Sequence, residues 1–223
     1  MRRRLALSWL AAILAAGGGG CGKATDARRA PPAASGEVHW LFSEPAGVLF
    51  TLTEITVAQY RACVDVDRCS PPGDDEWCNW SMAGREHHPV NCIDWSQAKA
   101  VCRWLGGRLP TEDEWYAEAS NGGTRRYPWG DEEVNCERAI WRKGCGREST
   151  WPVCSRPEGN SVSGLCDMSG NVWEWTATAG DESRRVVRGG SWLYDYPDAL
   201  RAAERGRNVP TDRNNHLGAR CVR

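Results

Sequence analysis

The eleven cysteines are the feature that most constrains this chain of 223 residues. So many cysteines in a short chain indicate either a disulfide framework or metal clusters. The chain contains no C-x-x-C pair, and none of its four histidines stands at zinc-binding spacing from a cysteine (His39, His87, His88 and His216). The spacing therefore favours disulfides, which form and persist in an oxidising compartment.

The N-terminus predicts export from the cytoplasm. Met1 to Arg4 is positively charged, Leu5 to Ala16 is an apolar run, and Gly17 to Gly20 lead into Cys21. The apolar run has twelve residues, too few to cross a bilayer, which needs about 20. The stretch resembles a bacterial lipoprotein signal, in which the cysteine is lipidated, although Gly18 stands where leucine is usual. A plain secretory signal is the alternative interpretation.

The lipoprotein interpretation divides the chain into three parts. We expect a signal peptide over residues 1–20, a lipidated N-terminus and flexible tether over 21–37, and one folded domain over 38–223. Gly22 and Lys23 follow Cys21, which in similar lipoproteins favours the outer membrane over the inner one. The expected location is therefore the bacterial cell envelope, with the membrane as a partner through the lipid anchor. Without Cys21, ten cysteines remain, enough for five bridges and no free thiol.

The composition predicts many turns and short elements around large aromatic side chains. The chain has 13 Trp against 2 Phe, with 24 Gly and 12 Pro. Its net charge of −1 offers no basic excess for a nucleic acid. Three capping boxes predict the starts of three helices, and two apolar runs predict strands. The boxes are Thr56 with Gln59, Asp94 with Gln97 and Thr111 with Glu114; the strands are Val48 to Thr53 and Arg185 to Arg188.

The stretch from Gly164 to Trp175, GLCDMSGNVWEW, is the strongest candidate for a ligand site. It places Asp167, Asn171 and Glu174 around a turn at Gly170. Carboxylates beside backbone carbonyls that a glycine turn exposes are the hard oxygen ligands that calcium selects. An ordinary tight turn that feeds two tryptophans into a core is the competing interpretation.

Five motifs in order resemble the formylglycine-generating enzyme (sulfatase-modifying factor) family. They are HPVNCIDWSQAKAVCRWLGGRLPTEDEW, YPWG, GLCDMSGNVWEW, VVRGGSW and LGARC. The resemblance implies a compact α+β domain related to C-type lectins, with sparse secondary structure, disulfide staples and bound calcium. Carried over by position, the calcium ligands are the Asp167 side chain, the Gly170 and Val172 carbonyls and the Glu174 carboxylate. The resemblance also implies a disulfide between Cys102 and Cys221.

Two features of the family are missing or incomplete in this chain. Family members that oxidise a sulfatase cysteine hold copper(I) with two cysteines soon after the GGS motif, and Tyr194 and Ala199 occupy those positions here. Copper is therefore not expected. Asn135 matches the first ligand of the family's other calcium site, but a cysteine-rich stretch around Cys145 and Cys154 replaces the segment that should complete it.

The resemblance also implies a surface groove for a peptide, and aromatic planes with arginine forks suit a peptide or a glycan. Arg201 and Arg205 have an alternative role as structural arginines with buried partners. The residues expected to line the groove are Trp173, Ser191, Trp192, Tyr194, Asp195, Tyr196, Arg201 and Arg205.

The sequence thus favours a cell-envelope lipoprotein whose domain lacks copper chemistry and serves as a calcium-stabilised binding or accessory module. The alternative is a periplasmic oxidoreductase that resembles the pyoverdine-maturation members of the family, which also work without the cysteine pair. No catalytic residue is assigned.

Overall fold

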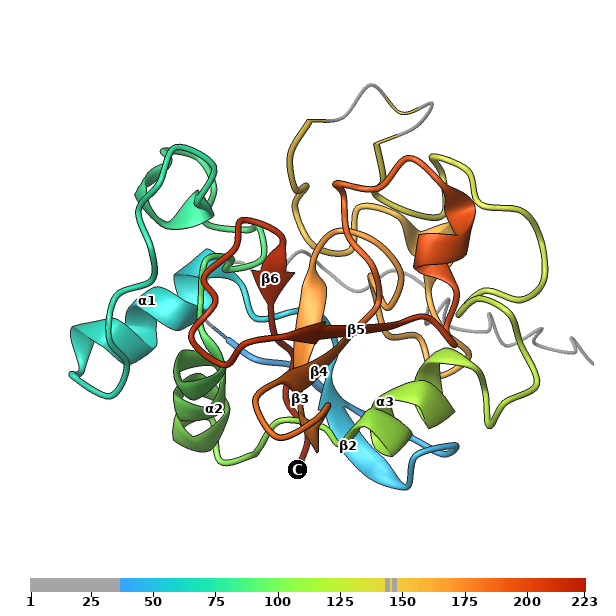
Figure 1. Cartoon of the computed structure of the whole chain (residues 1–223), viewed down its shortest axis with the longest axis horizontal. Helices are drawn as coiled ribbons and strands as arrows, with labels where there is room; N and C mark the ends of the chain where they lie inside the picture. Colours follow the sequence, from blue (N-terminus) through green and yellow to red (C-terminus); the bar gives the residue numbers. More distant parts are fainter. Residues whose placement is uncertain (1–36, 143–144, 146–147) are drawn as a thin grey trace, which may run out of the picture.

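The computed structural model describes residues 37–142, 145 and 148–223 (Figure 1). The predicted signal peptide, the lipidation site at Cys21 and all but the last residue of the predicted tether lie outside these ranges. Within them, no helix is both long and apolar enough to cross a membrane.

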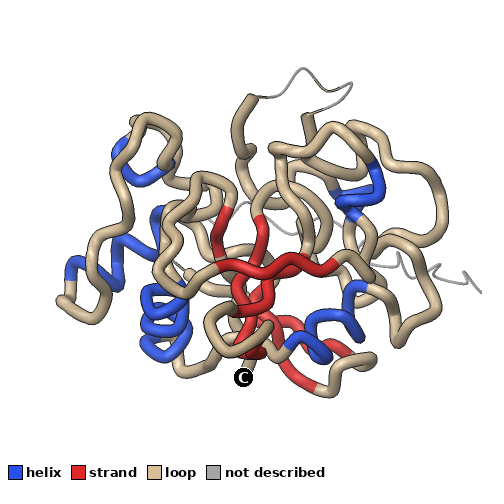
Figure 2. The backbone as a smooth tube through the Cα atoms, viewed as in Figure 1, coloured by secondary structure: helices blue, strands red, loops and turns tan. Residues whose placement is uncertain are grey.

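Short strands and helices are separated by long loops, as the composition predicts (Figure 2). The elements, in chain order, are β1 (Trp40–Ser43), β2 (Val48–Thr51), α1 (Val57–Asp65), α2 (Trp95–Trp104), α3 (Glu112–Ala119), β3 (Trp173–Ala179), β4 (Arg185–Arg188), β5 (Arg205–Asn208) and β6 (Leu217–Gly218). Short 3₁₀ turns cover Asn79–Ser81, Pro157–Gly159 and Pro197–Leu200. This sparse α+β fold, related to C-type lectins, confirms the predicted fold class.

A four-stranded sheet forms the centre of the domain. Its strand order is β5-β4-β3-β6, with β3 antiparallel to β4 and parallel to β6, while β1 and β2 form a separate hairpin. In Figure 1, α1 and α2 lie on one side of the central strands and α3 lies on the other. The sheet therefore brings the NVWEW strand, β3, into the middle of the molecule.

The three predicted helices begin where the capping boxes place them. At Thr56, Asp94 and Thr111 the side chain accepts from the backbone N–H three residues later. The Gln or Glu side chain at that later position accepts from the backbone N–H of the N-cap residue. β2 ends at Thr51, two residues before the predicted end at Thr53. There the hydroxyl of Thr51 donates to the Thr53 carbonyl, a local bond that competes with the strand ladder.

Five disulfides join the ten cysteines of the described residues. The predicted bridge between Cys102 and Cys221 is confirmed, and it links α2 to the C-terminal segment across 119 residues of sequence. The others are Cys63–Cys69, Cys78–Cys92, Cys136–Cys145 and Cys154–Cys166. These bridges staple the loop-rich regions, whose apolar content is too small to hold them by burial alone. They indicate a domain that folds outside the cytoplasm.

Candidate functional site

The loop that precedes β3 is buried and held from two sides. Gly170 has a φ of 91°, and a Cβ there would lie 2.6 Å from the carbonyl oxygen of Ile140. The Gly170 N–H donates to the Gly189 carbonyl at 2.8 Å, and the Asn171 N–H donates to the Ile140 carbonyl at 2.9 Å. Both the backbone conformation and the lack of space require glycine at position 170. The turn is therefore a fixed part of the interior.

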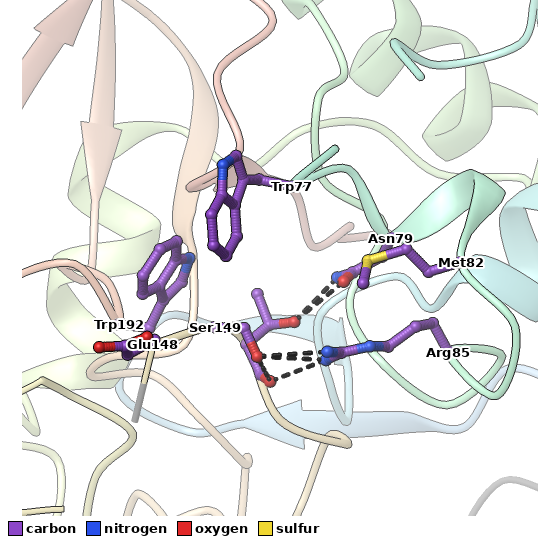
Figure 3. A pocket seen from close by; sticks show the side chains of 8 residues that line it. Trp77, Asn79, Met82, Arg85, Glu148, Ser149 and Trp192 are labelled. Atoms are coloured by element: carbon purple, nitrogen blue, oxygen red, sulfur yellow. Dashed lines mark hydrogen bonds between the residues drawn. The ribbon is translucent and has the colours of Figure 1, made fainter. Parts of the chain in front are cut away.

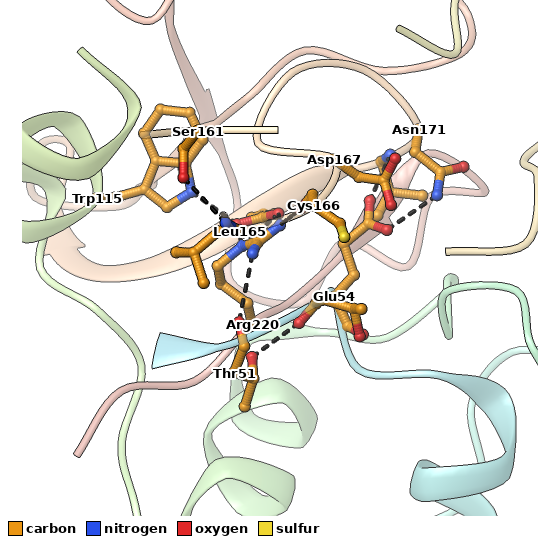
Figure 4. A network of polar contacts seen from close by, with 12 residues as sticks. Thr51, Glu54, Trp115, Ser161, Leu165, Cys166, Asp167, Asn171 and Arg220 are labelled. Carbon is orange, nitrogen blue, oxygen red and sulfur yellow. Dashed lines mark hydrogen bonds and ion pairs between the residues drawn. The ribbon is translucent and has the colours of Figure 1, made fainter. Parts of the chain in front are cut away.

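Glu174 lies fully buried on β3 and is paired with Arg220. The Arg220 Nη2 atom is 2.7 Å from Glu174 Oε1, and the Trp115 indole N–H donates to Glu174 Oε2 at 2.6 Å. Arg220 also donates to the Cys166 carbonyl at 2.8 Å. Figure 4 shows Trp115 and Arg220, from segments far apart in sequence, turned toward the same interior region. Glu174, a predicted calcium ligand, thus already has a cationic partner.

Glu54 is a member of this network that sequence reasoning missed. Its Oε2 atom accepts from the Asn171 side-chain amide at 2.9 Å, and Oε1 accepts from the Val172 N–H at 3.2 Å. Burial, first, and then the nearby charges of Asp167 and Glu174 raise the pKa of Glu54 well above its usual value. The available signal was a single acidic residue inside the apolar and β-branched run that precedes α1.

Asp167 is the third carboxylate of the interior. Its Oδ2 atom accepts from the Cys154 N–H at 2.7 Å. Burial raises the pKa of Asp167 to about 6, while that hydrogen bond and the charge of Arg220 act in the opposite direction. The disulfide between Cys154 and Cys166 lies next to this bond in the chain and keeps the donor in place.

This interior has the composition of a cation site. Its three carboxylates, Glu54, Asp167 and Glu174, share one fully buried guanidinium, Arg220, and this set carries a formal charge of −2 when ionised. The charge of the half-buried Arg156 also acts on Asp167. In addition, the Gly170 and Val172 carbonyl oxygens accept no hydrogen bond from other described residues, although both residues are buried. Buried carbonyls without a donor are rare and call for an explanation such as an ion. Asp167 and the two carbonyls are thus oxygen groups of the kind that calcium prefers, whereas both oxygens of Glu174 are already bonded to Arg220 or Trp115.

The histidine, cysteine and acidic side chains of the described ranges form no metal-binding cluster of three or more. The candidate site thus depends on backbone carbonyls as much as on side chains. Asn135, the partial match to the family's other site, instead accepts from the backbone N–H groups of Glu137 and Arg138, both at 3.0 Å.

The predicted groove residues divide into an aromatic set and a buried set. The Trp173 indole N–H donates to the Tyr194 hydroxyl at 3.2 Å, and Tyr194 packs edge-on against both Trp173 and Tyr196. Tyr196 is 51% exposed. Ser191 and Trp192 are buried, and Asp195 is exposed. A cavity of about 500 Å³ lies beside this segment, lined by Leu193 and His216 among others.

Both predicted groove arginines form ion pairs within the chain. Arg205 on β5 bonds to Glu112 at the start of α3, with an Nε to Oε1 distance of 2.5 Å, and Arg188 on β4 reaches the same carboxylate at 2.7 Å. Arg201 pairs with Asp198 at 2.6 Å. Both arginines thus have acidic partners within the chain, but these are not the buried partners of the alternative interpretation: Glu112 is partly buried and Asp198 is exposed.

The positions that carry the copper thiols in the family hold other side chains here. Tyr194 bonds to Trp173, and Ala199 is buried. Each cysteine of the described ranges belongs to one of the five disulfides. This part of the chain therefore contains no thiolate for a soft metal.

Comparison with known proteins identifies the family. Residues 45–223 match the sulfatase-modifying factor enzyme 1-like domain. The chain belongs to this family. Within the sulfatase-modifying factor family, the chain is similar to the formylglycine-generating enzyme of Streptomyces coelicolor, with 38% identity over 173 residues, 63% of this chain and 54% of that protein. It is equally similar to the inactive C-alpha-formylglycine-generating enzyme 2 of Bos taurus, with 39% identity over 152 residues, 60% of this chain and 50% of that protein.

A solved structure in the comparison shows the same fold. PvdO from Pseudomonas aeruginosa matches with a TM-score of 0.65 and 19% identity, over 84% of this chain and 91% of that one. The chain spans about half the length of the Streptomyces coelicolor and Bos taurus relatives. Relatives in the sulfatase-modifying factor family thus include proteins named as active enzymes and proteins named as inactive.

Proposed function

We propose that this domain is a calcium-stabilised binding or accessory module that lacks copper-dependent oxidation. The observation that carries the proposal is the state of the cysteines: ten are paired in disulfides, and Tyr194 and Ala199 stand at the copper positions. Copper(I) needs thiolates, so these residues cannot hold it. The similarity to a relative named as inactive agrees with this proposal.

Calcium is proposed at the loop that precedes β3. Asp167, the Gly170 and Val172 carbonyls and the Glu174 carboxylate would hold it. The excess of buried negative charge and the two carbonyls without donors support this assignment. A bound divalent ion would neutralise the interior and fix the loop that positions Trp173 and β3.

The binding surface is proposed beside the segment from Ser191 to Tyr196. The cavity of about 500 Å³ next to Leu193 supports a ligand there. Tyr196 and Trp77, both about half exposed, are the aromatic anchors expected for a peptide or a glycan. We further propose that the domain is tethered to the outer membrane through lipidated Cys21, a proposal that rests on the N-terminal sequence alone.

Metal analysis of the purified domain tests the function. The domain is loaded with copper(I), iron(II) or calcium, dialysed, and analysed for each element; it is then incubated with a cysteine-containing sulfatase peptide and oxygen. We expect about one calcium, no copper or iron, and no oxidation of the peptide thiol. Stoichiometric copper or iron together with oxygen consumption would instead establish the alternative, an oxidoreductase that works without the cysteine pair.

A further inference from the structure

A small pocket lies between the 3₁₀ turn Asn79–Ser81 and the GGSW segment. Its volume is about 160 Å³, which corresponds to the share of roughly five water molecules. We call it the Arg85 pocket. It is lined by Trp77, Asn79, Met82, Arg85, Glu148, Ser149, Thr150 and Trp192 (Figure 3).

Arg85 is the cation of this pocket, and its described partners are all uncharged. Its Nη1 atom donates to the Thr150 carbonyl at 3.2 Å and contacts His88 Nδ1 at 2.9 Å. Burial and the charge of Arg85 lower the pKa of His88 to about 4, so this imidazole is neutral at pH 7. Arg85 forms no ion pair with a carboxylate of the described residues.

One edge of the Arg85 guanidinium is available to a ligand. Nη1 takes up most of the contacts, whereas Nη2 has only a long contact of 3.4 Å to the Ser149 hydroxyl. The Nε–H donates to no acceptor in the described ranges. Nε and Nη2 form the parallel pair of donors with which arginine binds a carboxylate in a bidentate manner.

Three apolar side chains line the pocket beside its polar residues. Trp77 is 47% exposed and Met82 is 37% exposed, while Trp192 is almost fully buried. In Figure 3 the indoles of Trp77 and Trp192 lie on one side of Ser149, and Met82 and Arg85 lie on the other. The Asn91 side chain donates to the Trp77 carbonyl at 3.1 Å, and the disulfide Cys78–Cys92 begins at the next residue. The half-exposed indole is thus attached to an ordered backbone.

The charge and the surroundings of the pocket favour a monoanion on a chain. Glu148 also lines the pocket and repels any anion, a dianion such as a phosphate about twice as strongly as a carboxylate. A larger cavity of about 620 Å³ shares Arg85, Ser149 and Thr150 with the pocket and continues along residues 151–155. That cavity has room for the rest of an extended ligand.

We infer that the Arg85 pocket binds a carboxylate of a peptide, with Nε and Nη2 of Arg85 on the carboxylate and Trp77 and Trp192 against the adjoining apolar or aromatic side chain. This inference rests on the proposal that the domain is a binding module, and it adds the chemical class of the ligand. It uses neither the calcium loop nor the copper positions.

The test compares acetyl-Ala-Phe, which has a free carboxylate, with acetyl-Ala-Phe-amide, which differs only in lacking it. Binding is followed by calorimetry and by the NMR signal of the Trp77 indole N–H, assigned with a Trp77→Phe variant. We expect saturable binding of the acid and at least ~10-fold weaker binding of the amide, since a charge-assisted bond is lost. Equal binding of the two, or no binding of either, would overturn the inference.

Substitutions in the Arg85 pocket test whether the peptide acid binds there. Arg85→Gln is expected to weaken binding of the acid by about 10-fold or more, and Arg85→Lys by less, because lysine keeps the charge but not the fork. Arg61→Gln is the matched control, since Arg61 lies over Trp80 outside the pocket. If Arg85→Gln does not fold, Trp77→Ala serves, because the Trp77 side chain is half exposed. An unchanged Kd in a folded Arg85 or Trp77 variant would contradict the inference.

A third probe tests whether the Arg85 pocket prefers a carboxylate or a phosphate. Phenyl phosphate, which is larger in charge and similar in its ring, is expected to bind more weakly than the peptide acid. Tighter binding of phenyl phosphate would overturn the carboxylate assignment. The metal analysis does not depend on these probes. If the peptide acid does not bind and the domain takes up no copper, only this inference is refuted. Copper-dependent oxidation of the peptide thiol would refute the proposed function.

Discussion

The buried network under β3 and the Arg85 pocket differ in how their charges are compensated. In the network three carboxylates share one arginine in a fully buried interior. In the pocket a half-buried arginine has only uncharged described partners beside a partly exposed tryptophan. Excess negative charge in the interior requires a permanent cation or protons. The Arg85 guanidinium bonds to uncharged groups, although Glu148 lines the same pocket, and its free edge is the proposed site of an exchangeable anion. The same fold thus separates a proposed ion site from a proposed ligand site.

Removal of disulfides should give the largest effects and distinguish the two regions. In the chain-entropy model, loss of Cys102–Cys221 in a double alanine variant costs roughly 4 to 5 kcal/mol, because its loop spans 119 residues. Loss of Cys78–Cys92, which supports Trp77, costs about 3 kcal/mol for a separation of 14 residues. Denaturant unfolding of both variants provides the comparison. A larger cost at Cys78–Cys92 would show that the pocket region, not the network, limits stability.

Substitution of Arg220 tests the network directly. Arg220→Leu removes the fully buried guanidinium that is bonded to Glu174 and should destabilise the domain by about 3–5 kcal/mol. Arg207→Leu is the control, because Arg207 is exposed on β5 and surface changes usually stay within about 0.5 kcal/mol. The free energy of unfolding is measured at pH 7 with calcium present. A cost below about 1 kcal/mol for Arg220→Leu would mean that the carboxylates are not charged in the folded state.

The pocket region should make a smaller contribution to the free energy of unfolding, and this contribution should depend on pH through His88. The folded-state pKa of His88 is lowered from 6.5 to about 4. Between these values the unfolded chain binds a proton that the folded chain excludes. The stabilisation is therefore present above pH 6.5 and is lost as the pH falls toward 4. After allowance for solvent screening the loss is on the order of 1 kcal/mol.

Thermal unfolding at pH 7 and pH 4.5 measures this loss. The wild type is compared with His88→Gln, and His39→Gln is the control because His39 is exposed near the start of the domain. We expect the His88 variant to lose less stability on acidification than the wild type and the His39 variant to match the wild type. Equal pH dependence in all three proteins would contradict the role given to the neutral His88.

Local sequence signals predicted the three α-helices and the strands β2 and β4, but not β1, β3, β5 or β6. Each capping box specifies a helix start within four residues, so the starts at Thr56, Asp94 and Thr111 needed no tertiary information. β5 was missed because Arg205–Asn208 is polar and becomes a strand only by pairing with β4. The four other disulfides could not be paired because proximity is set by the folded loops.

The site was less accessible to sequence reasoning than the fold. Cys102–Cys221 and the NVWEW loop were found through family motifs. Glu54 was not, because its partners Asn171 and Val172 lie 117 and 118 residues away along the chain. The Arg85 pocket was missed for the same reason: no local pattern indicates that Arg85 and Trp192 line one cavity.

The most direct test of the central claim, that a divalent cation completes the buried network, is a calcium-dependent unfolding measurement. Wild-type domain and Asp167→Asn are unfolded thermally in calcium, in magnesium and in chelator. Calcium at 100 times its Kd should stabilise the wild type by about 2.7 kcal/mol, or roughly 5–10 °C in Tm, while magnesium and the variant should show little change. Wild-type melting curves that coincide in calcium and in chelator would contradict the claim.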